Sequence, residues 1–314
     1  MKAAVHREYG APQVVHIEER PDPVPSAKQV LIRVHASAVT AADSRIRGAR
    51  FPRGYGVLAR MIFGLRRPRS QVRGVVVSGV VEAVGAQVKG FAVGDEVCGS
   101  TGMGGAHAEL ATASTKRLVH KPAAVSHEQA AGMLFGGSTA LHFVRDVGHV
   151  SAGQTVLVNG ASGAVGTNAV QLAKHFGAEV TAVTSAANAA LLKELGADHV
   201  VDYAITPVAG LTERFDVVMD TVGNIGIEAG RRLLTDDGVM LLVAGTLGEA
   251  LRARGNVKGG TTAERAENYA TLLDLVADGT LTVVNQHVLE LEDIVRAYEI
   301  ADSGRKVGNV VVRP

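Results

Sequence analysis

The stretch QTVLVNGASGAVG, residues 154–166, joins an apolar run to a glycine-rich turn and then to a helical pattern. Within it, Ala161, Gly163 and Gly166 fill a G/A-x-G-x-x-G frame directly after an expected strand and at the start of an expected helix. Small residues are needed there because the backbone turns sharply, approaches a pyrophosphate, and packs helix against strand. The helix N-terminus offers such an anion free N–H groups and about half a positive charge. The turn therefore predicts a dinucleotide-binding site.

The chain around this turn alternates between short apolar runs and helical patterns. The patterns predict strands at 155–160, 179–185, 199–203, 215–223 and 238–245, and helices at 164–177 and 188–197. Parallel strands need a covering helix at each crossover, so this alternation predicts a doubly wound parallel sheet. Further on we expect helices at 262–279 and 291–304 and strands at 281–291 and 308–314.

The first 120 residues show a different pattern, with short apolar runs separated by glycine. The composition of the whole chain also limits the class of protein. Residues 30–37, 75–85 and 95–100 are β-rich and punctuated by glycine, which predicts short strands. The chain has 314 residues, 46% of them hydrophobic, with 32 basic and 31 acidic residues, so its overall charge indicates no particular partner. No leader-like apolar segment and no stretch of 18 apolar residues is present, so we expect a cytoplasmic protein with no membrane partner. The lone Cys98 excludes an internal disulfide and is expected to be a small, partly buried apolar residue.

The end of the second strand bears on the choice of dinucleotide. An NAD-selective site usually places Asp or Glu there, whereas residues 183–188 read VTSAAN. Glu179 precedes the strand, at the wrong end of the sheet. Hydroxyl and amide groups leave room for a 2′-phosphate, although no Arg or Lys lies nearby in sequence to bind it. The pattern favours NADPH and leaves NAD(H) as the alternative.

Two common devices for carbonyl reduction are missing from the sequence. None of the five tyrosines is followed four residues later by Lys, and the 11 histidines form neither an H-E-x-x-H motif nor a cluster with cysteine. The sequence therefore offers neither the Tyr–Lys pair nor a recognisable zinc motif for carbonyl reduction.

Seven stretches together resemble the zinc-independent, quinone-oxidoreductase-like branch of the medium-chain dehydrogenase/reductases over essentially the whole chain. They are SAVTAADSRIRG (37–48), SGVVEAVGAQVKGFAVGDEVCG (78–99), GGAHAELA (104–111), FGGSTALHFV (135–144), GASGAVG (160–166), LLKELGADHVVDY (191–203) and FDVVMDTVG (215–223). The resemblance implies a GroES-like catalytic domain from residues 1–120 and 261–314, with a Rossmann NAD(P)-binding domain, 121–260, inserted. Zinc-dependent relatives carry a Cys within the segment that reads AVTAADS here, and Gly-His-Glu where this chain has Arg73-Gly74-Val75-Val76. No zinc is therefore expected. The resemblance then implies hydride transfer arranged by proximity, with hydrogen bonds stabilising charge on the oxygen of a quinone or an α,β-unsaturated carbonyl.

The resemblance and the glycine turn together give the candidate site residues. Around the nicotinamide and substrate they are Thr40, where relatives usually have Asn, the matching Asp43 and Arg47, then Phe51, where many relatives have Tyr, and Tyr55. The expected cofactor-binding residues are Thr139, Gly160, Ala161, Ser162, Gly163, Ala164, Val165, Gly166, Thr184, Ser185, Asn188, Tyr203, Val222, Gly223, Ala244, Gly245 and Asn309. With Phe51 in place of Tyr, solvent is an alternative source of the proton.

Two further segments carry expectations. Only residues 246–260 are available between the fifth strand and the next helix, so the sixth strand should be short or missing. Family dimers pair through that edge, which leaves monomer and homodimer both open.

Residues 45–73 contain nine arginines and no acid, together with apolar residues that include Phe51, Leu58, Met61 and Phe63. Such a segment could cover the active-site mouth, bind an acidic substrate, or touch nucleic acid or an anionic membrane. We expect a mobile cover over the cleft of a small-molecule substrate, and disfavour nucleic acid. A non-catalytic NADPH-binding protein that engages a partner or RNA through this segment is the alternative function.

Overall fold

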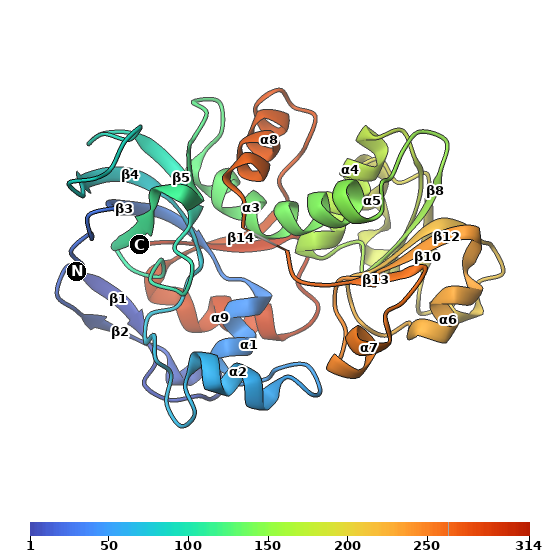
Figure 1. The fold of residues 1–314 in the computed structure, drawn as a ribbon, viewed down its shortest axis with the longest axis horizontal. Coiled ribbons are helices and arrows are strands. Elements are labelled where there is room, and N and C mark those ends of the chain that lie inside the picture. Colours follow the sequence, from blue (N-terminus) through green and yellow to red (C-terminus); the bar gives the residue numbers. More distant parts are fainter. Residues whose placement is uncertain (263) are drawn as a thin grey trace.

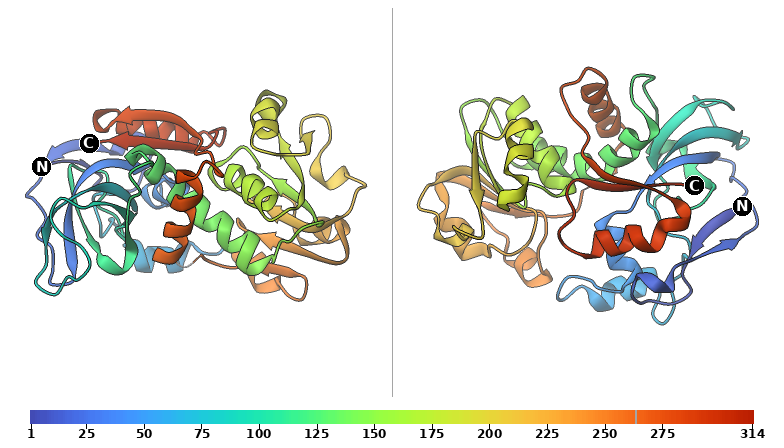
Figure 2. Two further views of the ribbon diagram at one scale, coloured as in Figure 1. Left: turned by 90° about the horizontal axis from the view of Figure 1, so that it is seen from above. Right: turned by 180° about the vertical axis from the view of Figure 1, so that it is seen from behind.

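Two large β-sheets stand at opposite ends of the molecule, and the helix α3 (His127–Leu141) runs between them (Figure 1). The computed structural model describes residues 1–262 and 264–314. The view from above shows the same division, with the two chain ends close together at one side (Figure 2). The candidate site lies where the two halves meet.

The sheet of the nucleotide-binding half has six parallel strands in the order β10-β9-β8-β11-β12-β13. Numbered along this half of the chain, the order is 3-2-1-4-5-6, which is that of a doubly wound dinucleotide-binding sheet. The strands are β8 (Thr155–Asn159), β9 (Glu179–Thr184), β10 (His199–Asp202), β11 (Phe215–Asp220), β12 (Leu234–Leu242) and β13 (Val257–Gly259). The helices packed on it are α4 (Ala164–His175), α5 (Ala189–Glu194) and α6 (Ile227–Arg232). The predicted Rossmann fold is confirmed.

The sixth strand is present, but it is only three residues long. It pairs with β12 at the edge of the sheet. This agrees with the expectation of a short strand, and the doubt about the usual dimer stays a prediction.

The second sheet joins both ends of the chain. Its strands follow the order β14-β15-β3-β4-β5-β7, and β6 also pairs with β3. The strands are β3 (Gln29–Ala38), β4 (Val76–Val84), β5 (Glu96–Ser100), β6 (Leu110–Ser114), β7 (Leu118–His120), β14 (Asn285–Glu290) and β15 (Asn309–Arg313). A separate antiparallel pair is formed by β1 (Lys2–Val5) and β2 (His16–Glu19). Because β15 pairs with β3, the C-terminus lies in the same half as residues 1–120, as expected. The exact domain bounds stay a prediction.

Helix α3 has no counterpart among the elements that hydrophobic periodicity predicts. Ser126 and Gln129 form a capping box at its start, and the helix continues into a π-helical turn over His142–Val147. It packs on β3, β4 and β5 as well as on α4, so it is buried on most sides. A Cβ at Gly136 would lie 2.2 Å from the carbonyl oxygen of Ala164, so this glycine lets the start of α4 approach closely. Helix α3 thereby holds the nucleotide-binding helix against the other half.

The remaining helices lie at the junction or around the second sheet. They are α1 (Ala41–Arg47), α2 (Gly56–Phe63), α7 (Leu247–Arg252), α8 (Ala266–Ala277) and α9 (Ile294–Asp302). The neighbours Leu272 and Leu273 on α8 enter two different hydrophobic cores, one in each half. Cys98 is fully buried, and burial raises the pKa of its thiol to about 12. Within residues 1–262 and 264–314, no helix combines the length and the apolar character needed to cross a membrane.

Candidate active site

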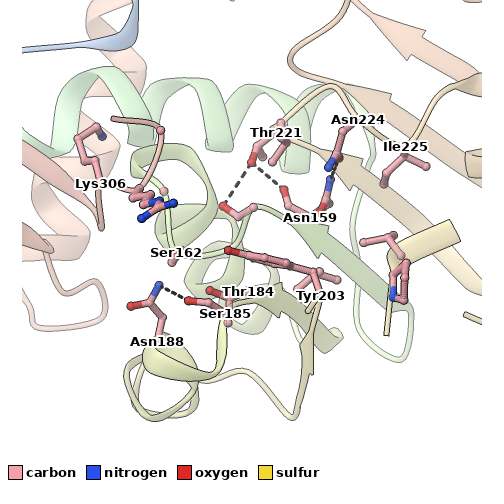
Figure 3. Close-up of a pocket in the computed structure, with 18 of the residues that line it drawn as sticks. Asn159, Ser162, Thr184, Ser185, Asn188, Tyr203, Thr221, Asn224, Ile225 and Lys306 are labelled. Carbon is pink, nitrogen blue, oxygen red and sulfur yellow. Dashed lines mark hydrogen bonds between the residues drawn. The ribbon is translucent and has the colours of Figure 1, made fainter. Parts of the chain in front are cut away.

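A cavity of about 710 Å³ lies at the carboxyl ends of β8, β9 and β11 (Figure 3). In an open parallel sheet, ligands bind at this edge, where the strand order reverses. The part of the chain that lines it comes from both halves of the molecule: Asn159, Gly160, Ser162, Gly163, Val183, Thr184, Ser185, Asn188, Tyr203, Pro207, Val208, Ala209, Thr221, Val222, Asn224, Ile225, Gly304, Arg305 and Lys306. We call it the nucleotide cavity.

The glycine turn at its base has the geometry that the sequence predicted. Gly160 has φ +77°, which favours glycine, and a Cβ at Gly166 would lie 2.2 Å from the Gly160 carbonyl oxygen. By contrast, a Cβ at Gly163 would meet nothing nearer than that same oxygen at 3.5 Å, so the space in front of Gly163 is open. Gly163 is also the N-cap of α4, and no side chain caps the free N–H groups there. The turn therefore leaves room and hydrogen-bond donors for a pyrophosphate.

A buried carboxylate holds the opposite wall. Asp220, at the end of β11, is fully buried and accepts hydrogen bonds from the backbone N–H groups of Val222, Gly223 and Ile225. It also accepts one from the Asn159 side-chain amide at 2.8 Å. These bonds fix the loop after β11 and occupy Asp220, so the carboxylate shapes the wall rather than facing the cavity.

The edge around the expected adenosine ribose contains no acid. Ser185 and Asn188 follow β9, Tyr203 follows β10, and all three line the nucleotide cavity (Figure 3). Glu179 lies at the other end of β9, where His199 contacts it at 2.9 Å, as the sequence indicated.

Two basic residues reach this cavity from the other half of the molecule. Arg305 and Lys306 precede β15, and the N–H of the nearby Gly308 donates to the Ser162 carbonyl oxygen at 2.8 Å. Figure 3 draws Lys306 at the edge of the cavity, and its ammonium donates to the Gly308 carbonyl oxygen at 2.5 Å. Burial lowers the pKa of the Lys306 ammonium to about 8. No Arg or Lys lies close to residues 183–188 in the sequence. The fold instead brings Arg305 and Lys306 to this edge from about 120 residues further along the chain.

A second cavity of about 370 Å³ adjoins the first, and Thr221 lines both. Its wall is mostly apolar, with hydroxyls of Ser138, Thr139 and Tyr269 and the Arg45 side chain among its polar groups. Burial raises the pKa of Tyr269, so this phenol is neutral throughout the ordinary pH range. We call this the substrate cavity. The remaining lining residues are Ala41, Ala42, Val75, Val76, Ser100, Phe135, Phe143, Val165, Val243, Ala244, Gly260, Thr261, Thr262 and Glu264.

None of the five residues expected to catalyse is among those that line either cavity. Thr40 caps α1: its hydroxyl donates to the Asp43 carboxylate at 2.6 Å and accepts from the Asp43 N–H at 3.1 Å. Asp43 is fully buried and also accepts from the Gly74 N–H at 3.1 Å. Fully buried Arg47 donates to the Gly10 carbonyl oxygen and to Asp302. These contacts fix both ends of α1.

Phe51 and Tyr55 lie on the segment that follows α1. Both are partly buried, and Phe51 stacks on Phe63 with ring centroids 6.0 Å apart. Between them, the Arg53 carbonyl oxygen accepts a hydrogen bond of 3.0 Å from the N–H of Leu247, the first residue of α7. The segment therefore contacts both halves of the molecule, and its role as a mobile cover over the cleft stays a prediction. A cover over the cleft would turn its apolar side chains inward, but Leu58 and Met61 are 53% and 50% exposed.

Most of the expected cofactor residues line one of the two cavities. Gly160, Ser162, Gly163, Thr184, Ser185, Asn188, Tyr203 and Val222 line the nucleotide cavity, while Thr139, Val165 and Ala244 line the substrate cavity. The residues not among those that line either cavity are Ala161, Ala164, Gly166, Gly223, Gly245 and Asn309. Thr221 and Asn224 were missed, although the rule that ligands bind at the carboxyl ends of parallel strands points to the loop after β11. Nothing in the sequence near Tyr269, Arg305 or Lys306 could have signalled their place in the site.

Comparison with known proteins agrees with this geometry. Residues 26–123 match the family described as alcohol dehydrogenase GroES-like domain, and residues 195–312 match the family described as zinc-binding dehydrogenase. A 2-methylene-furan-3-one reductase of Solanum lycopersicum is 31% identical over 100% of this chain and 79% of its own length. The chain belongs to the medium-chain dehydrogenase/reductase family, among its quinone-oxidoreductase-like members.

Solved structures of this family have the same fold. A quinone oxidoreductase from Coxiella burnetii superposes with a TM-score of 0.91 at 28% identity, covering 100% of this chain and 99% of that one. A mycobacterial protein complexed with NADPH superposes with a TM-score of 0.83 at 30% identity, covering 100% of both chains. The expected GroES-like and Rossmann architecture is therefore that of the family.

Proposed function

We propose that this protein is an NADPH-dependent, metal-free reductase of quinones or α,β-unsaturated carbonyl compounds. The observation that carries the proposal is the pair of cavities that meet at Thr221. One has the glycine turn and basic groups of a dinucleotide site, and the other combines an apolar wall with seven hydroxyl-bearing residues, Arg45 and Glu264, as suits a small organic substrate. Relatives named as a furanone reductase, as a quinone oxidoreductase and as a complex with NADPH support the same reading.

The nucleotide cavity fits NADPH part by part. The open space before Gly163 and the N-terminus of α4 suit the pyrophosphate, and the acid-free edge at Ser185 and Asn188 suits a ribose that carries a 2′-phosphate. Arg305 and Lys306 supply the positive charge that this phosphate needs. When bound, the cofactor supplies the hydride.

The substrate cavity supplies hydrogen bonds and excludes water. Arg45 and the Tyr269 hydroxyl can donate to a substrate oxygen as negative charge develops on it. The hydroxyls of Ser138 and Thr139 donate to the Phe135 carbonyl oxygen and would have to give up that bond to do the same. A conjugated carbonyl spreads this charge over several atoms, so a few neutral donors and one guanidinium are suited to the task. Thr40, Asp43 and Arg47 act as positioning residues, because they fix the helix from which Arg45 reaches the cavity.

The metal-free part of the proposal rests on the chemistry of these donors. In the described residues, no group of three His, Cys, Asp or Glu side chains is placed to hold a metal ion. The segment that carries Gly-His-Glu in zinc-dependent relatives lies here at the start of β4, where Val75 and Val76 contribute apolar wall.

The test is NADPH oxidation by the purified full chain against a panel of quinones, enones and saturated aldehydes. We expect turnover with quinones or enones and little with saturated aldehydes, whose reduction lacks the conjugation that spreads the charge. Tight NADPH binding without turnover on any compound would favour the non-catalytic alternative.

A further inference from the structure

Helix α2 and the short turn that follows it expose a row of large apolar side chains. Val57, Leu58, Met61, Ile62 and Leu65 are between 46% and 74% exposed. Within the helix, the spacing of one and four residues places Val57, Leu58, Met61 and Ile62 on one side, and Leu65 follows just after the helix ends. Of the fourteen large hydrophobic side chains exposed in the described residues, these five fall within nine positions. We call them the apolar stripe. A contiguous exposed patch of this kind marks an interaction surface.

The opposite face of α2 is attached to the protein. Ala59 is buried, and the Tyr9 hydroxyl donates to the Gly64 carbonyl oxygen at 2.7 Å. The Arg60 guanidinium lies over the Tyr9 ring, 5.2 Å from its centroid. Figures 1 and 2 both draw α2 at the outer margin of the molecule, away from the two sheets. The apolar stripe is therefore presented on a fixed support.

Positive charge surrounds the apolar stripe. Five exposed arginines flank it: Arg53, Arg60, Arg66, Arg67 and Arg69. Arg60 and Arg69 donate to backbone carbonyl oxygens of Leu65 and Ile62, which leaves their charge uncompensated. Among the described residues, the ion pairs formed by this segment use Arg47, Arg50 and Arg73 instead. The patch is strongly basic although the whole chain has a net charge of only +1.

We propose that α2 docks the protein on the surface of an anionic lipid membrane. A short helix with aliphatic side chains on one face and arginines around it suits the surface of a bilayer, where apolar acyl chains lie beneath charged headgroups. The aliphatic groups enter the boundary of the acyl chains, and the guanidinium groups contact the phosphates of the headgroups. The protein binds on the membrane and does not span it.

Charge and chemistry argue against other occupants of the patch. The five residues of the apolar stripe line neither cavity, so they do not form the wall of the cleft. A second copy placed face to face would bring two basic patches together, which is unfavourable. Nucleic acid would suit the arginines, but it stacks its bases on aromatic side chains, whereas the stripe is wholly aliphatic.

One consequence depends on the proposed function. The turn before α2 contacts α7 through the Arg53 carbonyl oxygen, close to the junction of the two halves. Quinones and enones with apolar substituents dissolve in bilayers, so docking here would bring the substrate cavity near their reservoir.

The experiment is flotation of the full chain with phosphatidylcholine vesicles, with and without phosphatidylglycerol. It needs neither substrate nor cofactor, so its result is independent of the proposed function. We expect binding only to the anionic vesicles, weakened by salt. Leu58→Ser with Met61→Ser, and separately Arg66→Glu with Arg67→Glu, should each lower the partition coefficient by about tenfold or more.

Matched controls lie on other faces of the molecule. Val24→Ser with Val93→Ser changes two apolar residues that are more exposed than Leu58 and Met61, and Arg231→Glu with Arg232→Glu makes the same change of charge on α6. Both control variants should bind as the wild type does, and thermal unfolding should show all four variants folded. The proposal is overturned by equal binding to neutral vesicles, by no binding, or by controls that lose as much as the α2 variants. Tighter binding to RNA than to vesicles, or a dimer that dissociates in the Leu58→Ser, Met61→Ser variant, would overturn it too.

Discussion

The nucleotide cavity and the substrate cavity share Thr221, but they differ in how far apart in the sequence their key residues lie. The base of the nucleotide cavity is one continuous stretch around residues 160–163, and its geometry follows from where small residues stand along a strand, a turn and a helix. The substrate cavity draws on α1, on α3, on the loop after β12 and on α8, which are far apart in the sequence. A site formed by local backbone geometry leaves a motif, whereas a site formed by packing leaves none.

The largest effect is expected in the glycine turn, where this contrast is sharpest. Gly163→Val should weaken NADPH binding by about 100-fold, because the side chain fills the open space of the nucleotide cavity and N–H contacts to the pyrophosphate are lost. The backbone there has φ −76°, which valine adopts, so the protein should stay folded. Fluorescence titration with NADPH measures the change.

A neighbouring glycine provides the control. Gly166→Ala should instead lower the melting temperature, since its Cβ would lie 2.2 Å from a backbone oxygen. Unchanged NADPH affinity in folded Gly163→Val would contradict the assignment of the turn.

The second prediction concerns the edge of the nucleotide cavity after β9, which the sequence indicated as the site of the adenosine ribose. Ser185→Asp should shift the preference toward NADH by about tenfold or more, because the new carboxylate repels a 2′-phosphate and can bond ribose hydroxyls. The measurement is the ratio of the dissociation constants of NADPH and NADH. A ratio that does not move would show that Ser185 lies away from the ribose.

The third prediction concerns the basic groups that only the fold brings to this cavity. Lys306→Met should weaken NADPH binding by about tenfold, equal to ~1.4 kcal/mol, and should change NADH binding much less. Burial lowers the pKa of Lys306 to about 8, so the wild-type side chain is charged below this pH and neutral above it. The affinity for NADPH should therefore fall as the pH rises from 7 to 9, and Lys306→Met should flatten this dependence. A Lys306→Met profile as steep as that of the wild type would contradict the role of this lysine.

The fourth prediction moves to the substrate cavity. Tyr269→Phe should lower kcat by about tenfold, since it removes one hydrogen bond to a developing negative charge. The dissociation constant of NADPH should stay unchanged, because Tyr269 does not line the nucleotide cavity. Steady-state kinetics with the best quinone or enone measures the effect, and Tyr9→Phe, outside both cavities, serves as the control. Equal kcat for Tyr269→Phe and the wild type would show that Tyr269 does not stabilise the developing negative charge.

The last prediction is that removing metal ions has no effect on activity. Dialysis against a strong chelator should leave the rate of NADPH oxidation intact, and elemental analysis should find no stoichiometric zinc, because the donors in the substrate cavity are not a metal-ligand set. A rate that is lost on chelation and recovered only with added zinc would overturn the metal-free mechanism.

Prediction from the sequence succeeded where structure is local and periodic. The parallel strands from β8 to β12 and helix α4 fall close to their predicted positions, because alternating apolar runs and helical spacing define them. Helix α3 escaped prediction because it is buried on most sides and contains Gly132, Gly136 and Gly137, so it has neither a polar face nor a strong helical composition. The predicted helix over 262–279 begins at Ala266 in the described residues, and Ala263 lies outside them.

The sequence by itself determined the family, the doubly wound sheet and the glycine turn, because each depends on residues that are neighbours along the chain. Only the tertiary structure decided which side chains complete the site. The pairing of β15 with β3 carries Arg305 and Lys306 to the nucleotide cavity, and the packing of α8 against α3 carries Tyr269 to the substrate cavity. It also turned Asp43 and Arg47 inward, where buried hydrogen bonds and an ion pair hold them, and left the apolar stripe of α2 facing solvent. Such placements depend on how distant segments share buried surface and hydrogen bonds, and a linear pattern does not record them.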